Sequence, residues 1–238
     1  MIFTTLKYDN RYILYDCDSF MDTDEISFTS TDWAQRDAIV GFAEGRGTTF
    51  FVSYLGRELA LRHYHRGGLI ARWSPDHYLW TGLESTRAWR ELRLLEKLLE
   101  SNLPVPRPIA AQVVREGLFY TADIMTQRIP GARTVGQLLT AGELDKAQWV
   151  AMGAVIRRFH EHGVYHADLN ANNIMRDQQG QFYLIDFDRG AIIRKRRRWQ
   201  QRNLQRLHRS LTKLRAARET FHFSEANWQD LQAGYNQT

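Results

Sequence analysis

The pattern of hydrophobic and polar positions divides the chain into a strand-rich first half and a helix-rich second half. Up to about residue 125, β-branched and aromatic residues form short runs separated by glycines, which is typical of strands joined by tight turns. These runs lie at 50–54, 58–64, 109–114 and 118–124. One helix interrupts them, because Leu92, Leu95 and Leu99 recur at helical spacing until the prolines of "LPVPRP" end the pattern.

Helical periodicity dominates the second half. A helix is predicted in "DKAQWVAMGAVIRRFHEHG", whose apolar residues share one face and which ends at Gly163. The segment 199–218 predicts a basic amphipathic helix whose apolar edge consists of Leu204, Leu207, Leu211 and Leu214. Short strands are predicted between these helices, at 174–175 and 182–185. Strands followed by helices predict an α+β fold with two lobes, residues 1–127 and 128–238.

Composition is compatible with folded lobes. Among the 238 residues, 43% are hydrophobic and 12% aromatic, which suffices for a core. Cys17 is the one cysteine, so an internal disulfide is excluded and a reducing compartment fits best. The N-terminus lacks a signal-like pattern, and no apolar run approaches the roughly 18 to 20 residues of a membrane span. We therefore expect a soluble cytoplasmic protein.

The net charge of +5 hides a strong asymmetry along the chain. Residues 1–45 form an acidic extension with nine acids and three bases, whereas residues 194–218 contain eleven Lys or Arg and no acid. Such a basic tail indicates binding to nucleic acid, an anionic membrane surface or an anionic substrate. A merely solvated helix face is the alternative. The pattern leaves open whether residues 1–35 form an acidic cap, an added strand or a mobile arm.

The candidate chemistry lies in "YHADLNANNIMRDQQGQFYLIDFDRG", residues 165–190. Asp168 and Asn173 are five residues apart in a loop between a helix and a strand. Asp186 follows the strand "FYLI", which a tight turn at "RDQQGQ" would fold back beside Ile174 and so bring Asp186 near Asn173. An acid and an amide for a divalent metal, with a separate acid for proton transfer, are what phosphoryl transfer requires. A polar turn rich in Asp and Asn is the alternative.

The motifs "HADLNANN" and "DFD" resemble the H-x-D-L-x-x-x-N loop and the D-F-G motif of protein-kinase-like phosphotransferases. The resemblance implies a bilobal fold, with an antiparallel sheet and one helix in the N-lobe and a mainly helical C-lobe. It also implies that ATP is bound with Mg²⁺ or Mn²⁺. In that family Asp168 would be the catalytic base, and Asn173 and Asp186 would be the metal ligands.

Other parts of the kinase pattern are present in weaker form. "GFAEGRGTTFFV" would cover the phosphates, with Gly45 and Gly47 allowing close backbone approach, although an ordinary hairpin turn has the same sequence. "ELALR" places Arg62 where kinases have lysine, and arginine can still bind phosphate. Glu91 is the expected helix partner of Arg62; Glu84, Glu96 and a simply exposed Glu91 are the alternatives. Adenine is expected to bind the hinge backbone near Thr126, Gln127 and Arg128.

Two departures from the protein-kinase pattern concern the acceptor. Ala167 replaces the arginine of H-R-D, and Asp188 replaces the glycine of D-F-G. No proline follows Pro130, so the A-P-E motif of the peptide-positioning segment is impossible. A small-molecule or lipid-sugar acceptor is therefore favoured over a protein.

Residues 35–220 are similar to the 3-deoxy-D-manno-octulosonic acid (Kdo) kinases among the bacterial lipopolysaccharide core kinases. The similarity lies in "GRGTTFF", "ELALRHYHRGGLIAR", "WTGLESTRAWREL", "LPVPRPIAA" and "YHADLNANNI". It implies ATP-dependent phosphorylation of the Kdo 4-hydroxyl on Kdo–lipid A during lipopolysaccharide core biosynthesis. It also implies a peripheral location at the cytoplasmic face of the inner membrane. Arg62 fits the "ALRHY" context of this family.

The acceptor suggests a use for the remaining basic residues. The basic tail helix would dock on the anionic membrane surface, with its leucines in the core. Asn170, Arg189 and Arg194 flank the catalytic loop and would bind the Kdo carboxylate; surface ion pairs are the alternative for both arginines. "RGGLIAR", residues 66–72, would cover either the nucleotide or the acceptor.

Competing functions remain open at this stage. One is a kinase for another acceptor, a core heptose or a small alcohol. The other is a nucleotide-binding pseudokinase or a nucleic-acid-binding module. The intact acid and amide set argues against a pseudokinase, and no RNA-recognition signature is present. We therefore expect neither nucleic acid nor an obligate protein partner.

Overall fold

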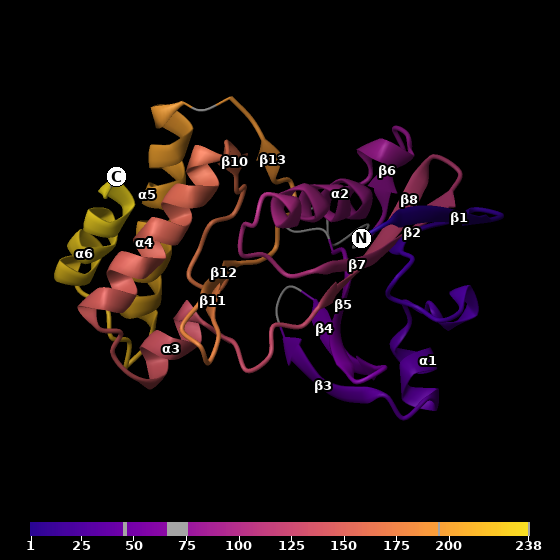
Figure 1. The fold of residues 1–238 in the computed structure, drawn as a ribbon, viewed down its shortest axis with the longest axis horizontal. Coiled ribbons are helices and arrows are strands. Elements are labelled where there is room, and N and C mark those ends of the chain that lie inside the picture. The colour runs from indigo at the N-terminus through magenta and orange to yellow at the C-terminus, as the bar shows by residue number, and fades with distance from the viewer. Residues whose placement is uncertain (45–46, 66–75, 195, 238) are drawn as a thin grey trace. The chain divides into compact units, whose positions relative to one another are not determined.

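The structure, a computed structural model, describes residues 1–44, 47–65, 76–194 and 196–237 (Figure 1). The chain forms two compact units. Unit 1 consists of Met1–Glu96 and Pro106–Arg128, and unit 2 consists of Lys97–Val105 and Ile129–Thr238. The chain therefore enters unit 2 briefly before it returns to complete unit 1.

Unit 1 is built on one antiparallel sheet, as the sequence predicts. Its strands are β1 (Phe3–Tyr8), β2 (Arg11–Asp16), β3 (Ile39–Glu44), β4 (Thr48–Tyr54), β5 (Arg57–His63), β6 (Tyr78–Leu79), β7 (Pro108–Glu116) and β8 (Phe119–Gln127). The order across the sheet is β1-β2-β7-β8-β5-β4-β3, and β6 pairs with β8. The hairpin β7–β8, which comes last among the strands of unit 1, thus occupies the centre of the sheet.

The acidic N-terminal segment adds both strands and a packed cap. β2 pairs with β7 in antiparallel register, for example Ile13 opposite Gln112. The short helices η1 (Thr23–Glu25) and α1 (Ser30–Gln35) follow. Phe28 and Trp33 then bury their rings against Leu59 of β5 in one hydrophobic cluster. The question left open by the sequence is settled: residues 1–35 are part of the fold of unit 1.

The predicted helix is α2 (Arg87–Glu100), which follows the turn η3 (Leu83–Ser85) and belongs to unit 1 up to Glu96. Its repeating leucines face inward, and both Leu92 and Leu95 are buried. The helix ends at Glu100, just before "LPVPRP", as the prolines predict. One buried polar residue, Glu91, stands among these leucines.

Unit 2 is mainly helical, also as predicted. It contains β9 (Arg133–Thr134), α3 (Val135–Ala141), α4 (Lys146–Glu161), β10 (Val164–Tyr165), β11 (Ile174–Arg176), β12 (Phe182–Leu184), β13 (Ala191–Ile192), α5 (Arg197–Ala217) and α6 (Glu225–Asn236). Two small sheets have the orders β12-β11-β9 and β10-β13. The buried face of α4 is the predicted one, with Trp149, Met152, Ile156 and Phe159 in the core.

α6 lies directly against α4, and glycines allow this contact (Figure 1). A Cβ on Gly153 of α4 would lie 2.0 Å from the Leu231 carbonyl oxygen, and one on Gly234 would lie 2.0 Å from the Val150 carbonyl oxygen. Real Cβ atoms never approach so closely, so the helix backbones touch only because both positions lack a side chain. The sequence reasoning did not anticipate α6.

Candidate active site

A buried carboxylate on α2 binds an arginine of the sheet in unit 1. Arg62 on β5 donates from Nη2 to both carboxylate oxygens of Glu91 on α2, each at 2.8 Å. The side chain of Glu91 is 3% exposed and that of Arg62 is 27% exposed. Tyr64 donates its hydroxyl hydrogen to the same carboxylate. The predicted pair of Arg62 with Glu91 is confirmed, and the other two candidates contact different groups: Glu84 accepts from Trp89, and Glu96 pairs with Arg93.

The glycine-rich hairpin joins β3 to β4. Gly45 lies outside the described residues, as does the segment 66–72. Gly47 is described, and a Cβ at this position would lie 2.2 Å from Cδ2 of His65. A side chain at position 47 would therefore require the ring of His65, also in unit 1, to move. Contact with a nucleotide remains a prediction.

The predicted hinge residues form the end of β8. Thr126 pairs with Ala60 of β5. The N–H of Gln127 donates to the Arg107 carbonyl at 2.8 Å, and the N–H of Arg128 donates to the Glu58 carbonyl at 2.9 Å. These two backbone donors are therefore engaged within the sheet. An adenine that binds in this segment would need other backbone groups of the hinge.

The catalytic loop of unit 2 connects β10 to β11 and contains Asp168. His166 organises its first turn. Nε2 of His166 lies 3.0 Å from the Ile185 carbonyl, which can only accept, so Nε2 carries the hydrogen. Nδ1 then accepts from the N–H of Asp168 at 3.2 Å. Burial lowers the pKa of His166, which favours this neutral form of the ring.

Two asparagines fix the other side of the Asp168 peptide. Nδ2 of Asn173 donates to the Asp168 carbonyl at 2.9 Å, and Nδ2 of Asn170 donates to the same oxygen at 3.0 Å. Oδ1 of Asn170 also accepts from the N–H groups of Asn172 and Asn173. Asn170 therefore stabilises the loop backbone, and its predicted contact with the acceptor is untested.

The predicted hairpin after the loop is present. β11 and β12 pair in antiparallel register with Ile174 opposite Leu184, and the N–H of Ile185 donates to the Asn173 carbonyl at 3.0 Å. Asp186 is therefore the residue directly after Ile185, the backbone partner of Asn173. Its φ of 61° is in the left-handed region, which costs energy for a residue with a side chain and is frequent at functional sites.

Asn173 and Asp186 have the chemistry of a magnesium site. Because the Asn173 amide nitrogen is turned towards the Asp168 carbonyl, Oδ1 points away from it as a potential ligand. An amide oxygen and a carboxylate are hard oxygen donors, and Mg²⁺ takes few protein ligands besides water and phosphate. Within the described ranges, no group of three or more His, Cys, Asp or Glu side chains could hold a metal ion. The carboxylate and amide pair is nevertheless a suitable donor set.

The two arginines predicted to bind the acceptor lie beyond this hairpin. Arg189 is exposed and has a φ of 57°. Arg194 is also exposed, and its carbonyl accepts from Nε1 of Trp199 at 3.0 Å. Both guanidinium groups are accessible to an anion, and their predicted role stays a prediction.

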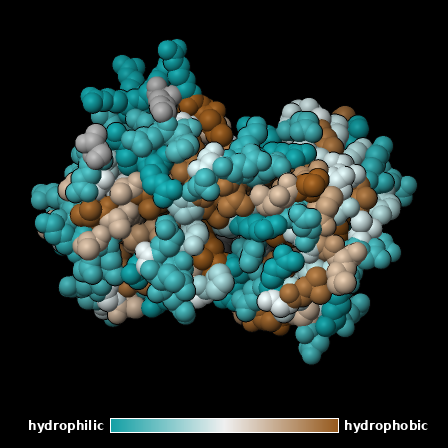
Figure 2. Space-filling model, viewed as in Figure 1, coloured by the Kyte–Doolittle hydropathy of each residue, from teal (hydrophilic) through white to brown (hydrophobic). Residues whose placement is uncertain are grey.

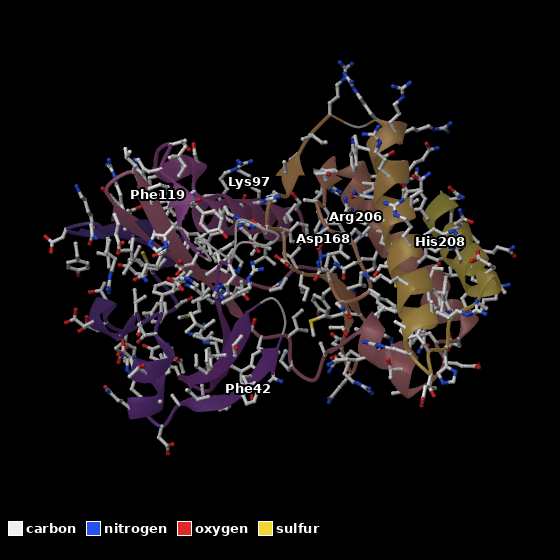
Figure 3. All side chains as sticks on the ribbon, turned by 180° about the vertical axis from the view of Figure 1, so that it is seen from behind. Phe42, Lys97, Phe119, Asp168, Arg206 and His208 are labelled. Atoms are coloured by element: carbon white, nitrogen blue, oxygen red, sulfur yellow. The ribbon has the colours of Figure 1, made fainter. Side chains whose placement is uncertain are left out.

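Sequence reasoning missed the helix face that contacts the catalytic loop. Asn203 of α5 is buried and clamps His166: its Nδ2 donates to the His166 carbonyl at 3.0 Å, and its Oδ1 accepts from the His166 N–H at 3.3 Å. Arg206 reaches the Asp168 carboxylate, as Figure 3 shows, with Nη1 3.5 Å from Oδ1. Ser210 accepts from the N–H of Ala171 at 3.3 Å. The helical spacing of these polar residues was the available signal.

The face of α5 opposite its leucine edge is basic and exposed. Leu207 and Leu211 are buried, while Leu204 and Leu214 are half-buried, so the predicted apolar edge is present. The exposed cations at the beginning of the helix are Arg196, Arg197, Arg198 and Arg202. Figure 2 shows hydrophilic side chains gathered at that end of unit 2. No helix in the described part of the chain has the length and apolarity needed to cross a membrane.

Comparisons with known proteins agree on one family. The family described as Lipopolysaccharide kinase (Kdo/WaaP) matches residues 30–235. A 3-deoxy-D-manno-octulosonic acid kinase of Photobacterium profundum is 40% identical over 230 residues, with 97% of each chain covered. The same-named protein of Haemophilus influenzae (strain 86-028NP) is 38% identical over 239 residues, 97% of this chain and 98% of that protein. That of Stenotrophomonas maltophilia (strain K279a) is 46% identical over 207 residues, which are 87% and 82% of the two chains.

Proposed function

Because the chain belongs to the lipopolysaccharide kinase (Kdo/WaaP) family, we propose that it transfers the γ-phosphoryl group of ATP to the 4-hydroxyl of Kdo on Kdo–lipid A. Relatives named as Kdo kinases match nearly the whole chain. The observation that carries the proposal is a pair of hydrogen bonds: Asn173 donates from Nδ2 to the Asp168 carbonyl, and its own carbonyl accepts from the N–H of Ile185, the residue before Asp186. Asp168, Asn173 and Asp186 are the set of groups that phosphoryl transfer to an alcohol requires.

Asp168 acts on the acceptor hydroxyl. Its carboxylate accepts a hydrogen bond from that hydroxyl and takes its proton as the oxygen attacks the γ-phosphorus. The new O–P bond forms as the bond between phosphorus and the β,γ-bridging oxygen breaks, and ADP leaves. His166 donates to the Ile185 carbonyl and accepts from the N–H of Asp168, so it positions the Asp168 backbone and takes no part in proton transfer.

Asn173 and Asp186 would hold Mg²⁺ through an amide oxygen and a carboxylate. When bound, the ion would offset negative charge on the phosphates of ATP. The hydrogen bond from Asn173 to the Asp168 carbonyl links the metal-binding residue directly to the catalytic one. A change at Asn173 should therefore affect both functions.

In unit 1, Arg62 would bind the α- and β-phosphates. A guanidinium group presents planar N–H donors that suit phosphate oxygens, and Glu91 holds that of Arg62 through Nη2. The buried carboxylate of Glu91 restricts the guanidinium to one orientation, which reduces the entropy lost when phosphate binds. Arginine thus replaces the usual lysine while the helix carboxylate keeps its orienting role.

The basic face of α5 would dock on the cytoplasmic face of the inner membrane. Its exposed arginines carry charge opposite to that of phosphate headgroups, and each contributes about 1 kcal/mol near an anionic surface before screening. Replacing Arg197, Arg198 and Arg202 together by glutamine should therefore weaken binding to phosphatidylglycerol vesicles by about 100-fold at low salt. Sedimentation with neutral phosphatidylcholine vesicles is the control. Unchanged binding to the anionic vesicles would exclude this face as the docking surface.

The decisive experiment is transfer of labelled phosphate from ATP to purified Kdo–lipid A, with the phosphorylated position determined by mass spectrometry. Asp168→Ala should abolish turnover and leave the fold and ATP binding intact. A core heptose acceptor and an aminoglycoside are tested in parallel. Phosphorylation of one of these in place of Kdo–lipid A would reassign the acceptor, and near-normal turnover of Asp168→Ala would disprove the role of the base.

A further inference from the structure

We propose that Arg206 of α5 is a positioning residue that holds the Asp168 carboxylate in its reactive orientation. The inference rests on the proposed phosphoryl transfer and adds a residue from outside the catalytic loop. The loop Tyr165–Asn173 itself contains no lysine or arginine. Arg206 brings a positive charge to the catalytic carboxylate from a helix that starts more than twenty residues later.

The hydrogen bonds within the loop engage the backbone of Asp168, whereas Arg206 contacts its side chain. The N–H and C=O of Asp168 are both engaged, with His166 on one side and Asn170 and Asn173 on the other. These bonds fix the backbone of Asp168. Arg206 contacts the carboxylate itself, with Nη1 3.5 Å from Oδ1.

α5 is itself held rigidly against the loop on both sides of Arg206. Three residues earlier, Asn203 clamps both backbone groups of His166; four residues later, Ser210 accepts from the N–H of Ala171. Leu207 beside them is completely buried. The register of helix residues 203, 206 and 210 with loop residues 166, 168 and 171 therefore places the guanidinium reproducibly at the carboxylate.

Because the ion pair of Arg206 with Asp168 is partly exposed, its effect on turnover can be measured separately from its effect on stability. The side chain of Arg206 is 46% exposed and that of Asp168 is 38% exposed, and ion pairs this accessible stabilise a fold only slightly. Removing Arg206 should therefore leave the protein folded. A misplaced catalytic group, by contrast, can reduce turnover by as much as about 100-fold.

The test compares Arg206→Gln and Arg206→Lys with Arg157→Gln. Arg157 forms an ion pair of similar exposure with Glu161 on α4 and is outside the proposed machinery. Initial rates are measured with ATP and detergent-dispersed Kdo–lipid A, so that docking on a bilayer does not contribute. We expect kcat of Arg206→Gln to fall by about 10- to 100-fold, with both KM values within about twofold of the wild type. Arg206→Lys should retain a kcat several-fold above that of the glutamine variant, because it keeps the charge.

Three results would overturn the inference while the wild type remains active. These are a kcat of Arg206→Gln close to that of Arg157→Gln, equal kcat values for the lysine and glutamine variants, or a loss confined to KM. Urea denaturation of each variant confirms that the compared proteins are folded. A wild type unable to phosphorylate Kdo–lipid A would instead refute the proposed function, so the two failures are distinguishable.

Discussion

Replacing Glu91 by glutamine is expected to destabilise unit 1 by about 2 kcal/mol. Breaking a fully buried ion pair costs about 3–5 kcal/mol, because the remaining charge is left without its partner. Glu91 is fully buried, whereas 27% of the Arg62 side chain is accessible, so water can partly replace the lost carboxylate. Glutamine also keeps an oxygen for the Tyr64 hydroxyl, which removes part of the penalty. The partial exposure of Arg62 and the oxygen kept by glutamine together reduce the expected cost to about 2 kcal/mol.

The measurement is urea denaturation of the full chain, followed by tryptophan fluorescence and far-UV circular dichroism. With an m value of about 2 kcal/mol per M, a loss of 2 kcal/mol lowers the midpoint of unit 1 by about 1 M. Arg93→Gln is the matched control, because Arg93 pairs with Glu96 on the same helix but is 38% exposed. This control should change the free energy of unfolding by less than about 1 kcal/mol.

A double-mutant cycle with Arg62→Gln tests the physical reason. If the pair acts as a unit, the double variant should be more stable than the sum of the two single changes predicts. Additive effects, or a loss from Glu91→Gln no larger than that from Arg93→Gln, would refute the view that Arg62 and Glu91 form a buried, mutually dependent pair. The cost of Glu91→Gln would then have to arise elsewhere in α2.

Three further outcomes follow from unit 2. Burial lowers the pKa of His160 to about 4 from its usual 6.5, so the unfolded state binds a proton first and the free energy of unfolding should fall by about 3 kcal/mol as pH drops from 6.5 to 4. Denaturation of His160→Gln should show a weaker fall with pH. The same fall in this variant as in the wild type would contradict the assignment to His160. Gly153→Ala forces α6 away from α4 and should lower Tm by several degrees. Gly142→Ala should not, because a Cβ at that position would have no neighbouring atom within 4 Å. Equal changes of Tm in the two variants would contradict the close packing of the helices. Asn203→Ala leaves the buried backbone groups of His166 without their partner. It should lower the free energy of unfolding by about 2 kcal/mol and reduce kcat strongly. A variant as active and as stable as the wild type would show that Asn203 does not hold the loop.

Local periodicity predicted those parts of the fold that depend on short stretches of chain. α2 and α4 begin and end near their predicted limits, because leucine spacing, prolines and Gly163 act within a few turns. The hairpin of β11 and β12 was predictable for the same reason, since its turn lies between the two strands. The proximity of Asn173 and Asp186 follows directly from that hairpin.

Pairing between distant segments could not be predicted from the sequence. β2 finds its partner β7 about one hundred residues later, and nothing in residues 11–16 specifies that choice. The face of α5 that meets the catalytic loop includes the buried Asn203 and the half-exposed Arg206, neither of which belongs to an apolar stripe. Hydrophobic periodicity identifies the side that is buried in the core, but it does not identify polar residues that contact backbone groups.

The strand order of unit 1 also constrains the sequence of events during synthesis. β1–β2 and β3–β5 emerge from the ribosome first, but in the finished sheet β7 and β8 stand between them. Until Gln127 has emerged, β2 and β5 each present an unpaired edge, and such edges invite association with other chains. The sheet can close only when its last hairpin inserts at the centre, so nascent chains that end near residue 105 should be the form that most requires chaperones.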